Sequence, residues 1–366
     1  MYMRSKLLVL FLLAGTAYPQ SRLDSHSKMH LTFPEESPVS VVGADWGEST
    51  QSPRGSAMLL DLHTSLLLKN AGSKRIRGIT LLVLAQEVTP GGKASVTVPS
   101  LNVAPGETFP IRVDLRLLRP MQNNNGPAVE IGLDGVLYED LSFYGTDRLN
   151  SRRAMTVWEL EARRDRKYFR NVLENGGPDA LKQEMLASLE RQAGRSGMDA
   201  HVAQGRASNT YPEHNQRVAF LELPNAPVDI TGAQVGLAGD EARRPTIYVS
   251  SRSDRPIRSM EVGWMVKDQR GKTYITGVIP LNVSLQPFGS TTIVQDSAFK
   301  FSEGNGQPVL LDSISGFVNS VEYSDGRMWV PDRNPRLLNP SPEEQRLTQI
   351  YRKKGAQALA EELKKF

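Results

Sequence analysis

The sequence predicts a mainly β protein made of two antiparallel β-sandwiches, each followed by a helical segment. Short runs of alternating apolar and polar residues, separated by Gly and Pro, are typical of a sandwich. Beyond residue 150 the apolar period changes from two towards four, which indicates helix. The second half of the chain then repeats the element order of the first half. These three observations together predict a repeated sandwich-plus-helix unit.

The composition excludes several classes of chemistry. The 366 residues are 39% hydrophobic and include no cysteine, so disulfides, thiolate metal sites and cysteine nucleophiles are ruled out. The chain has 44 Lys and Arg residues against 40 Asp and Glu residues. This near balance does not favour a nucleic-acid partner, because such proteins present a concentrated basic surface to several phosphates.

Residues 1–17 have the pattern of a signal peptide, with cleavage after residue 17 or as late as residue 20. Arg4 and Lys6 precede an apolar run at residues 7–14. That run is shorter than the roughly 20 apolar residues that a membrane-spanning helix needs. We therefore expect a secreted or periplasmic protein with no transmembrane anchor after cleavage, and an uncleaved membrane tether is the alternative.

The first sandwich is predicted at residues 55–148, after a flexible leader at residues 21–54 that is polar and contains several prolines. Residues 109–117 alternate apolar and polar side chains, which predicts a half-buried strand. Apolar residues occupy both odd and even positions of residues 76–85, so both faces of this segment should be buried, which predicts a central strand. Asp134-Gly135 predicts a hairpin turn, because both residue types tolerate positive φ.

A helical hairpin is predicted at residues 151–193. Its apolar residues form two stripes at helical spacing, which a Gly-Gly-Pro sequence ending at Pro178 separates. The basic run at residues 152–170 predicts either a solvated helix face or an anionic docking face. Residues 194–216 are polar and contain several glycines, so we expect an interdomain linker there.

Ordered matches between the two halves indicate an internal duplication. The matched segments are residues 74–79 with 255–260, 101–105 with 283–287, 134–135 with 325–326, and 177–181 with 355–359. The second unit is accordingly predicted as a sandwich at residues 217–331 and a C-terminal helix at residues 341–366, which Gly355 should break or bend. A fragment beginning at Arg217 is expected to fold alone.

The second sandwich carries the same strand pattern as the first. Met260, Val262, Trp264 and Val266 alternate along one strand, and residues 269–272 then turn the chain. The pattern resembles tandem immunoglobulin-like or fibronectin-type β-sandwich modules of exported bacterial proteins. This resemblance implies a spacer, a scaffold or a binding surface, since such a fold does not define an activity. The intersheet disulfide of antibody-type domains is absent.

No catalytic, cofactor or metal site is predicted. The five histidines form no ligand set, and no nucleophile elbow, phosphate-binding loop or dinucleotide fingerprint is present. Asp134 and Asp325 are interpreted as turn residues rather than paired carboxylates. Trp329 is the candidate binding aromatic, because a ring near the end of a sheet can stack on a sugar or on a partner's side chain. Core packing is its alternative, and it is the interpretation we give to Trp158 and Trp264.

These observations favour a noncatalytic secreted or periplasmic binding or scaffold protein of the cell envelope. The expected partner is a protein or another envelope component, and no cofactor is expected. The alternatives are an exported hydrolase with dispersed carboxylates and a carbohydrate-binding module. A cavity that holds two carboxylates would favour the hydrolase.

Overall fold

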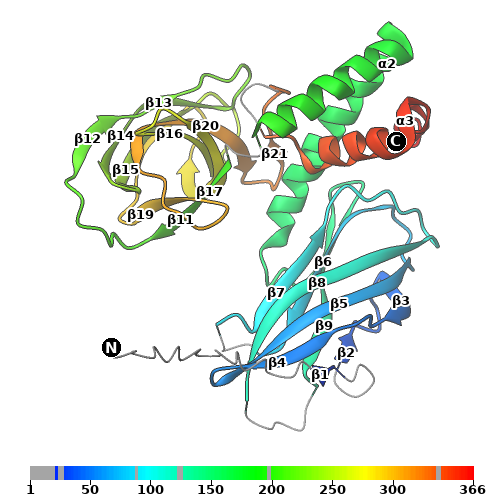
Figure 1. The fold of residues 1–366 in the computed structure, drawn as a ribbon. Helices are drawn as coiled ribbons and strands as arrows, with labels where there is room; N and C mark the ends of the chain where they lie inside the picture. The colour runs from blue at the N-terminus through cyan, green and yellow to red at the C-terminus, as the bar shows by residue number, and fades with distance from the viewer. Residues whose placement is uncertain (1–20, 24–28, 87–89, 122–126, 196–198, 335–338) are drawn as a thin grey trace, which may run out of the picture. The chain divides into compact units, whose positions relative to one another are not determined.

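The computed structural model describes residues 21–23, 29–86, 90–121, 127–195, 199–334 and 339–366. The predicted signal peptide at residues 1–17 lies outside the described residues. The chain is mainly β, as the sequence predicts, and it divides into two compact units (Figure 1). The first unit comprises Met1–Val98 and Val103–Ser151, and the second comprises Pro99–Asn102 and Arg152–Phe366.

The first unit contains two five-stranded sheets. Its strands are β1 (Ser21–Arg22), β2 (Met29–Thr32), β3 (Val39–Asp45), β4 (Thr50–Arg54), β5 (Ala57–Asn70), β6 (Ile76–Leu84), β7 (Lys93–Val98), β8 (Thr108–Pro120), β9 (Val129–Tyr138) and β10 (Phe143–Gly145). One sheet has the order β1-β4-β5-β3, with β8 also paired to β5. The other has the order β10-β9-β6-β7, with β2 also paired to β9.

Two predicted strands of this unit are confirmed. In β8, the apolar side chains of Phe109, Ile111 and Val113 are buried, and Pro110 and Arg112 between them are exposed. In β6, eight of nine residues are buried, because β7 and β9 flank this strand on its two sides. The alternating pattern and the continuous apolar pattern therefore distinguish a one-faced strand from a central one.

The structure differs from the predicted flexible leader at residues 21–54 and the predicted linker at residues 194–216. The first region contains β1 to β4, and the second contains β11 (Asp199–Gly205) and most of β12 (His214–Arg217). Side chains of β4 are at most half-buried, and those of β12 are mostly exposed. Because these strands bury few side chains and are held mainly by main-chain pairing, their sequences lack the apolar alternation that indicates a strand.

The predicted hairpin turn at Asp134-Gly135 is wrong. Both residues lie inside the continuous strand β9, where the pairing with β6 passes from Gly135 to Leu133, so Asp134 is the extra residue of a β-bulge. The buried carboxylate of Asp134 accepts a hydrogen bond from the backbone N–H of Arg148 at 2.9 Å. Gly135 is needed because the ring of Phe143 occupies the place of its absent side chain.

The second unit contains one nearly closed, barrel-like sheet of eleven strands. The further strands are β13 (Ala219–Phe220), β14 (Val228–Ala238), β15 (Glu241–Ser251), β16 (Ile257–Asp268), β17 (Thr273–Leu285), β18 (Ser290–Val294), β19 (Ala298–Glu303), β20 (Leu311–Tyr323) and β21 (Met328–Trp329). Their order is β12-β14-β15-β19-β11-β17-β16-β20-β13, with β18 on β15 and β21 on β20. The sequence predicts two separate sheets here, but β11 joins β19 to β17.

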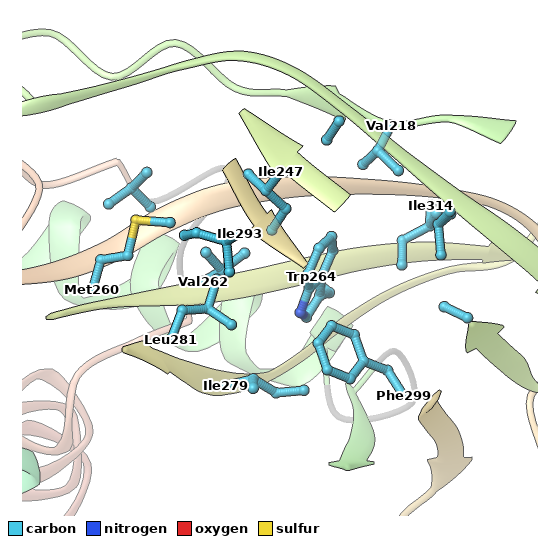
Figure 2. Close-up of a cluster of buried hydrophobic side chains, with 14 of the residues drawn as sticks. Val218, Ile247, Met260, Val262, Trp264, Ile279, Leu281, Ile293, Phe299 and Ile314 are labelled. Atoms are coloured by element: carbon cyan, nitrogen blue, oxygen red, sulfur yellow. The ribbon is translucent and has the colours of Figure 1, made fainter. Parts of the chain in front are cut away.

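The core of this sheet surrounds Trp264, which is 1% exposed (Figure 2). Its ring lies 5.5 Å from that of Phe299 and 5.8 Å from that of Phe220, between centroids. Ile247 and Ile314 belong to the same cluster. Core packing of Trp264, as the sequence predicts, is therefore confirmed.

Two broken helices complete the second unit. The helix α2 (Ser151–Arg195) is interrupted at Gly177, with φ 74° and ψ −174°, and α3 (Pro342–Leu363) is interrupted at Gly355, with φ 82° and ψ −178°. The serine hydroxyl of Ser341 begins α3 by accepting a hydrogen bond from the Glu344 N–H at 3.0 Å. Both breaks were expected from the sequence, and their dihedral angles are nearly the same.

The two helices pack through one buried cluster whose members fit the expected duplication. Its members are Phe169, Leu181 and Met185 from α2 and Leu347, Leu359 and Leu363 from α3. Each residue of the first set corresponds to one of the second at a constant offset of 178 residues. The two helices therefore use equivalent positions to cover each other.

Strand register supports the duplication but corrects one of its matches. Ile76 pairs with Tyr138 in the first unit, and Ile257 pairs with Tyr323 in the second. Each tyrosine carbonyl accepts a hydrogen bond at 3.0 Å from the N–H three residues later, and in both turns this fourth residue has positive φ. The equivalent of Asp325-Gly326 is therefore residues 140–141, and not the predicted Asp134-Gly135.

Candidate functional site

Trp329, the aromatic residue singled out by the sequence, lies on β21 and pairs with Val321. Its side chain is half-buried and packs against the core cluster of the second unit. This placement agrees with the packing alternative. Trp158, which was expected in a core, is instead half-buried and faces a cavity.

The cavity has a volume of about 250 Å³ and lies within the second unit. It is bounded by the first turns of α2, by parts of β16, β17 and β20, and by the segment before α3. The lining residues are Ala154, Val157, Trp158, Glu161, Glu261, Thr276, Gly277, Val278, Phe317, Asn319, Asn339, Pro340, Ser341 and Pro342. It thus combines two aromatic rings, two carboxylates and side-chain amides.

The residues from α2 reach the cavity because of helical spacing. Ala154, Val157, Trp158 and Glu161 follow the i, i+3, i+4, i+7 pattern, so they lie on one face of the helix. Glu161 therefore places a carboxylate on a stripe that is otherwise apolar. The sequence contained this signal, but the interpretation of residues 152–170 as a solvated face or a docking face concealed it.

Burial changes the acid–base properties of Glu161. Loss of water around the carboxylate is the largest influence and raises its pKa from 4.5 to about 7. Arg164 opposes the increase, while the negative charges of Asp165 and Glu261 add to it. Within the described part of the chain, no hydrogen bond reaches the Glu161 side chain. This carboxyl group is therefore close to half-protonated at neutral pH.

The second carboxylate of the cavity, Glu261, already has partners. Its Oε1 lies 3.3 Å from the Arg153 Nε, and its Oε2 accepts a hydrogen bond from the Ser320 hydroxyl at 2.8 Å. The nearby Asp165 is also paired, since it accepts a hydrogen bond from the Arg164 Nε at 2.9 Å. Glu161 thus differs from the acids around it in having no direct partner.

Asp165 also fixes the wall of the cavity that precedes α3. Its Oδ2 accepts a hydrogen bond from the Ser341 hydroxyl at 2.5 Å, and its Oδ1 lies 3.4 Å from the Arg333 Nη1. Asp165, Glu159 and Arg166 are at most 3% exposed. The basic run on α2 is therefore partly a buried ion-pair network and not a fully solvated face.

A second hollow lies beside β17 and β18. It has a volume of about 360 Å³ and is lined mainly by amide and hydroxyl side chains, including Asn282, Thr291 and Gln295. None of its lining residues is acidic or basic. The cavity at Glu161 is the better candidate, because it combines a polar recognition group with apolar walls.

The described residues include neither a cluster of metal-ligand side chains nor a membrane-spanning helix. Among them, no group of three or more His, Asp or Glu side chains is placed to hold a metal ion. Neither described helix is long and apolar enough to cross a membrane.

No family model matches the chain, and no curated protein matches it. Among solved structures, it is similar to β-glucosidase from Kluyveromyces marxianus at 10% identity, covering 76% of this chain and 45% of that chain, with a TM-score of 0.17. Red sea bream transglutaminase matches at 8% identity over 81% of this chain and 32% of that chain, with a TM-score of 0.13. The chain spans less than half the length of either protein. TM-scores this low carry no conclusion about fold or function.

Proposed function

We propose that the protein is a noncatalytic secreted or periplasmic binding or scaffold protein of the cell envelope, in which the Glu161 cavity holds part of a protein or envelope partner. The observation that carries the proposal is the placement of an unpartnered carboxylate beside Trp158 in a cavity with apolar walls. A buried polar group without a partner has a free-energy cost, which a ligand that supplies the partner removes.

We also propose that both units are modified immunoglobulin-like or fibronectin-type sandwiches. The pairings β5-β8 and β7-β6-β9-β10 of the first unit recur as β15-β18 and β17-β16-β20-β21 in the second. In the second unit, β11 then connects the two groups of strands. The repeated pairing supports a tandem-module architecture, in which one unit can serve as a spacer for the other.

A cavity-blocking variant tests the proposed function. Gly277 lines the cavity and has open space where a side chain would begin, so Gly277→Phe should fill the cavity and leave the fold intact. Gly43→Phe is the matched control on β3 of the first unit, where the space is also open. We expect cross-linking of the purified chain to the envelope fraction of the source organism to yield a specific product that Gly277→Phe abolishes and Gly43→Phe retains. An identical product with all three proteins would contradict a role for the cavity.

One observation favours a hydrolase as the second candidate. Glu161 and Glu261 line the same cavity, and burial raises the pKa of Glu161 to about 7, as a general acid requires. This activity predicts saturable turnover of a glycoside or peptide that declines above about pH 7 and is lost in Glu161→Gln. Absence of turnover, together with cavity-dependent cross-linking, would support the binding function instead.

A further inference from the structure

We propose that the cavity binds a basic group, the ammonium of a lysine or the guanidinium of an arginine side chain on the partner, with Glu161 as its counter-ion. The inference rests on the proposed function, because it specifies the ligand of the same cavity.

The pairing of charges around the cavity leaves one negative charge without a partner. Arg153 pairs with Glu261, and Arg164 pairs with Asp165. Of these four groups, Arg164 and Asp165 on α2 and Glu261 on β16 act electrostatically on Glu161. Of the two carboxylates that line the cavity, Glu261 is thus paired, and Glu161 has no ion-pair partner among the described residues. An anionic ligand would meet this carboxylate and Glu261 together, so the cavity selects against it.

The other lining groups suit a cation on an apolar stem. Trp158 lies one turn before Glu161 on the same helix face, and an indole ring attracts a cation by its π-face. Phe317 and Val278 offer apolar contact for a methylene chain, and the amides of Asn319 and Asn339 can accept hydrogen bonds. At about 250 Å³ the cavity is smaller than the roughly 300–1,000 Å³ of typical ligand sites, so it fits a side chain better than a cofactor.

Binding should be coupled to loss of a proton from Glu161. The free carboxyl group has a pKa of about 7, and a bound cation favours its ionised form. At low pH the ligand must displace the proton, whereas above pH 7 it meets a carboxylate. For a single linked group, the affinity at pH 5.5 should be about 30-fold lower than at pH 8.

The experiment uses the full chain with N-acetyl-lysine methylamide as the probe and N-acetyl-norleucine methylamide as its uncharged analogue. Binding is followed by NMR of 13C-labelled glutamate carboxyls, which also reports the titration of Glu161. We expect the lysine probe to bind at pH 8, to bind about 30-fold more weakly at pH 5.5, and to shift the Glu161 signal. Glu161→Gln should weaken binding at pH 8 at least tenfold and remove the pH dependence.

Glu190→Gln is the matched control, because Glu190 is an exposed acid on the same helix. It should leave both affinity and pH dependence unchanged. Equal binding of the two probes, without any effect of Glu161→Gln, would overturn the cation proposal but retain the cavity as a binding site. Failure of both probes, together with cross-linking that Gly277→Phe does not affect, would overturn the proposed function as well.

Discussion

The guanidinium of Arg333 donates hydrogen bonds to both carboxylate oxygens of Glu344, at 2.6 Å from Nη1 and 2.8 Å from Nη2. Burial alone would raise the pKa of Glu344, but the hydrogen bonds and charge of Arg333 hold it below its ordinary value. The same guanidinium lies 3.4 Å from Asp165 and stacks 4.7 Å from the ring centroid of Phe169. Arg333 thereby connects the segment before α3 to both helices.

Replacing Arg333 with Ala is expected to lower the free energy of unfolding by about 3–5 kcal/mol, because the buried carboxylate of Glu344 loses both hydrogen bonds from Arg333 and Asp165 keeps only the Arg164 guanidinium beside it. Urea-induced unfolding measures the change. Arg270→Ala removes an exposed arginine and should change stability by no more than about 0.5 kcal/mol. Equal unfolding curves for the two variants would contradict the structural importance of the Arg333 pairs.

Glu161 should make the free protein less stable as the pH rises. Its pKa is higher in the folded chain, at about 7, than the ordinary 4.5, so the folded state binds the additional proton. The resulting stabilisation is complete below about pH 4.5 and is lost as the pH rises through 7.

Allowing for its partial exposure, we expect Glu161 to contribute about 1–2 kcal/mol more stability at pH 5.5 than at pH 8. Comparing urea unfolding of the natural chain and Glu161→Gln at the two pH values isolates this contribution. If both proteins show the same pH dependence, the pKa of Glu161 is not raised.

The two helix breaks should require glycine for backbone reasons alone. Gly177 and Gly355 both have positive φ with ψ near 180°, a region that other residues avoid, yet both have open space where a side chain would begin. We expect Gly177→Ala and Gly355→Ala each to destabilise the protein by about 1–3 kcal/mol in thermal unfolding. Gly194→Ala, within α2 and also unobstructed, should be neutral or stabilising by about 0.5 kcal/mol. An equal loss of stability with Gly194→Ala would contradict the backbone explanation.

The sequence predicted these breaks because the signal is local: a glycine interrupts an apolar stripe that resumes four residues later, at Leu181 and Leu359. Local sequence patterns gave wrong predictions where contacts between distant segments determine the conformation. Asp134-Gly135 has the chemistry of a turn, but the bulge opposite β6 and the ring of Phe143 explain the same two residues. Strands such as β12 were not predicted because their side chains are mostly exposed and their sequences show no apolar alternation. The helical spacing of Glu161 was visible in the sequence, but its enclosure by β16, β17 and the segment before α3 depends on tertiary structure.

The variant Trp329→Ala tests whether the Trp329 ring contributes to core packing or to carbohydrate binding. Because the ring packs half-buried against the core, its loss should reduce the free energy of unfolding by about 1–3 kcal/mol, less than the roughly 3–5 kcal/mol of a fully buried aromatic residue. Migration of the folded variant in gels that contain polysaccharide should equal that of the natural chain. Retardation of the natural chain that disappears in the variant would instead support the carbohydrate-binding alternative.

The boundaries of the second unit give the last prediction. A fragment beginning at Arg217 lacks β11, which pairs with both β17 and β19, and it lacks α2, which covers Leu347, Leu359 and Leu363 of α3. Removing these elements exposes apolar surface and leaves two strand edges unpaired. We therefore expect residues 152–366 to unfold in one cooperative calorimetric transition, and the shorter fragment to show a broad transition or none. A cooperative transition of the shorter fragment at the same temperature would show that β11 and α2 are dispensable, as the sequence alone had suggested.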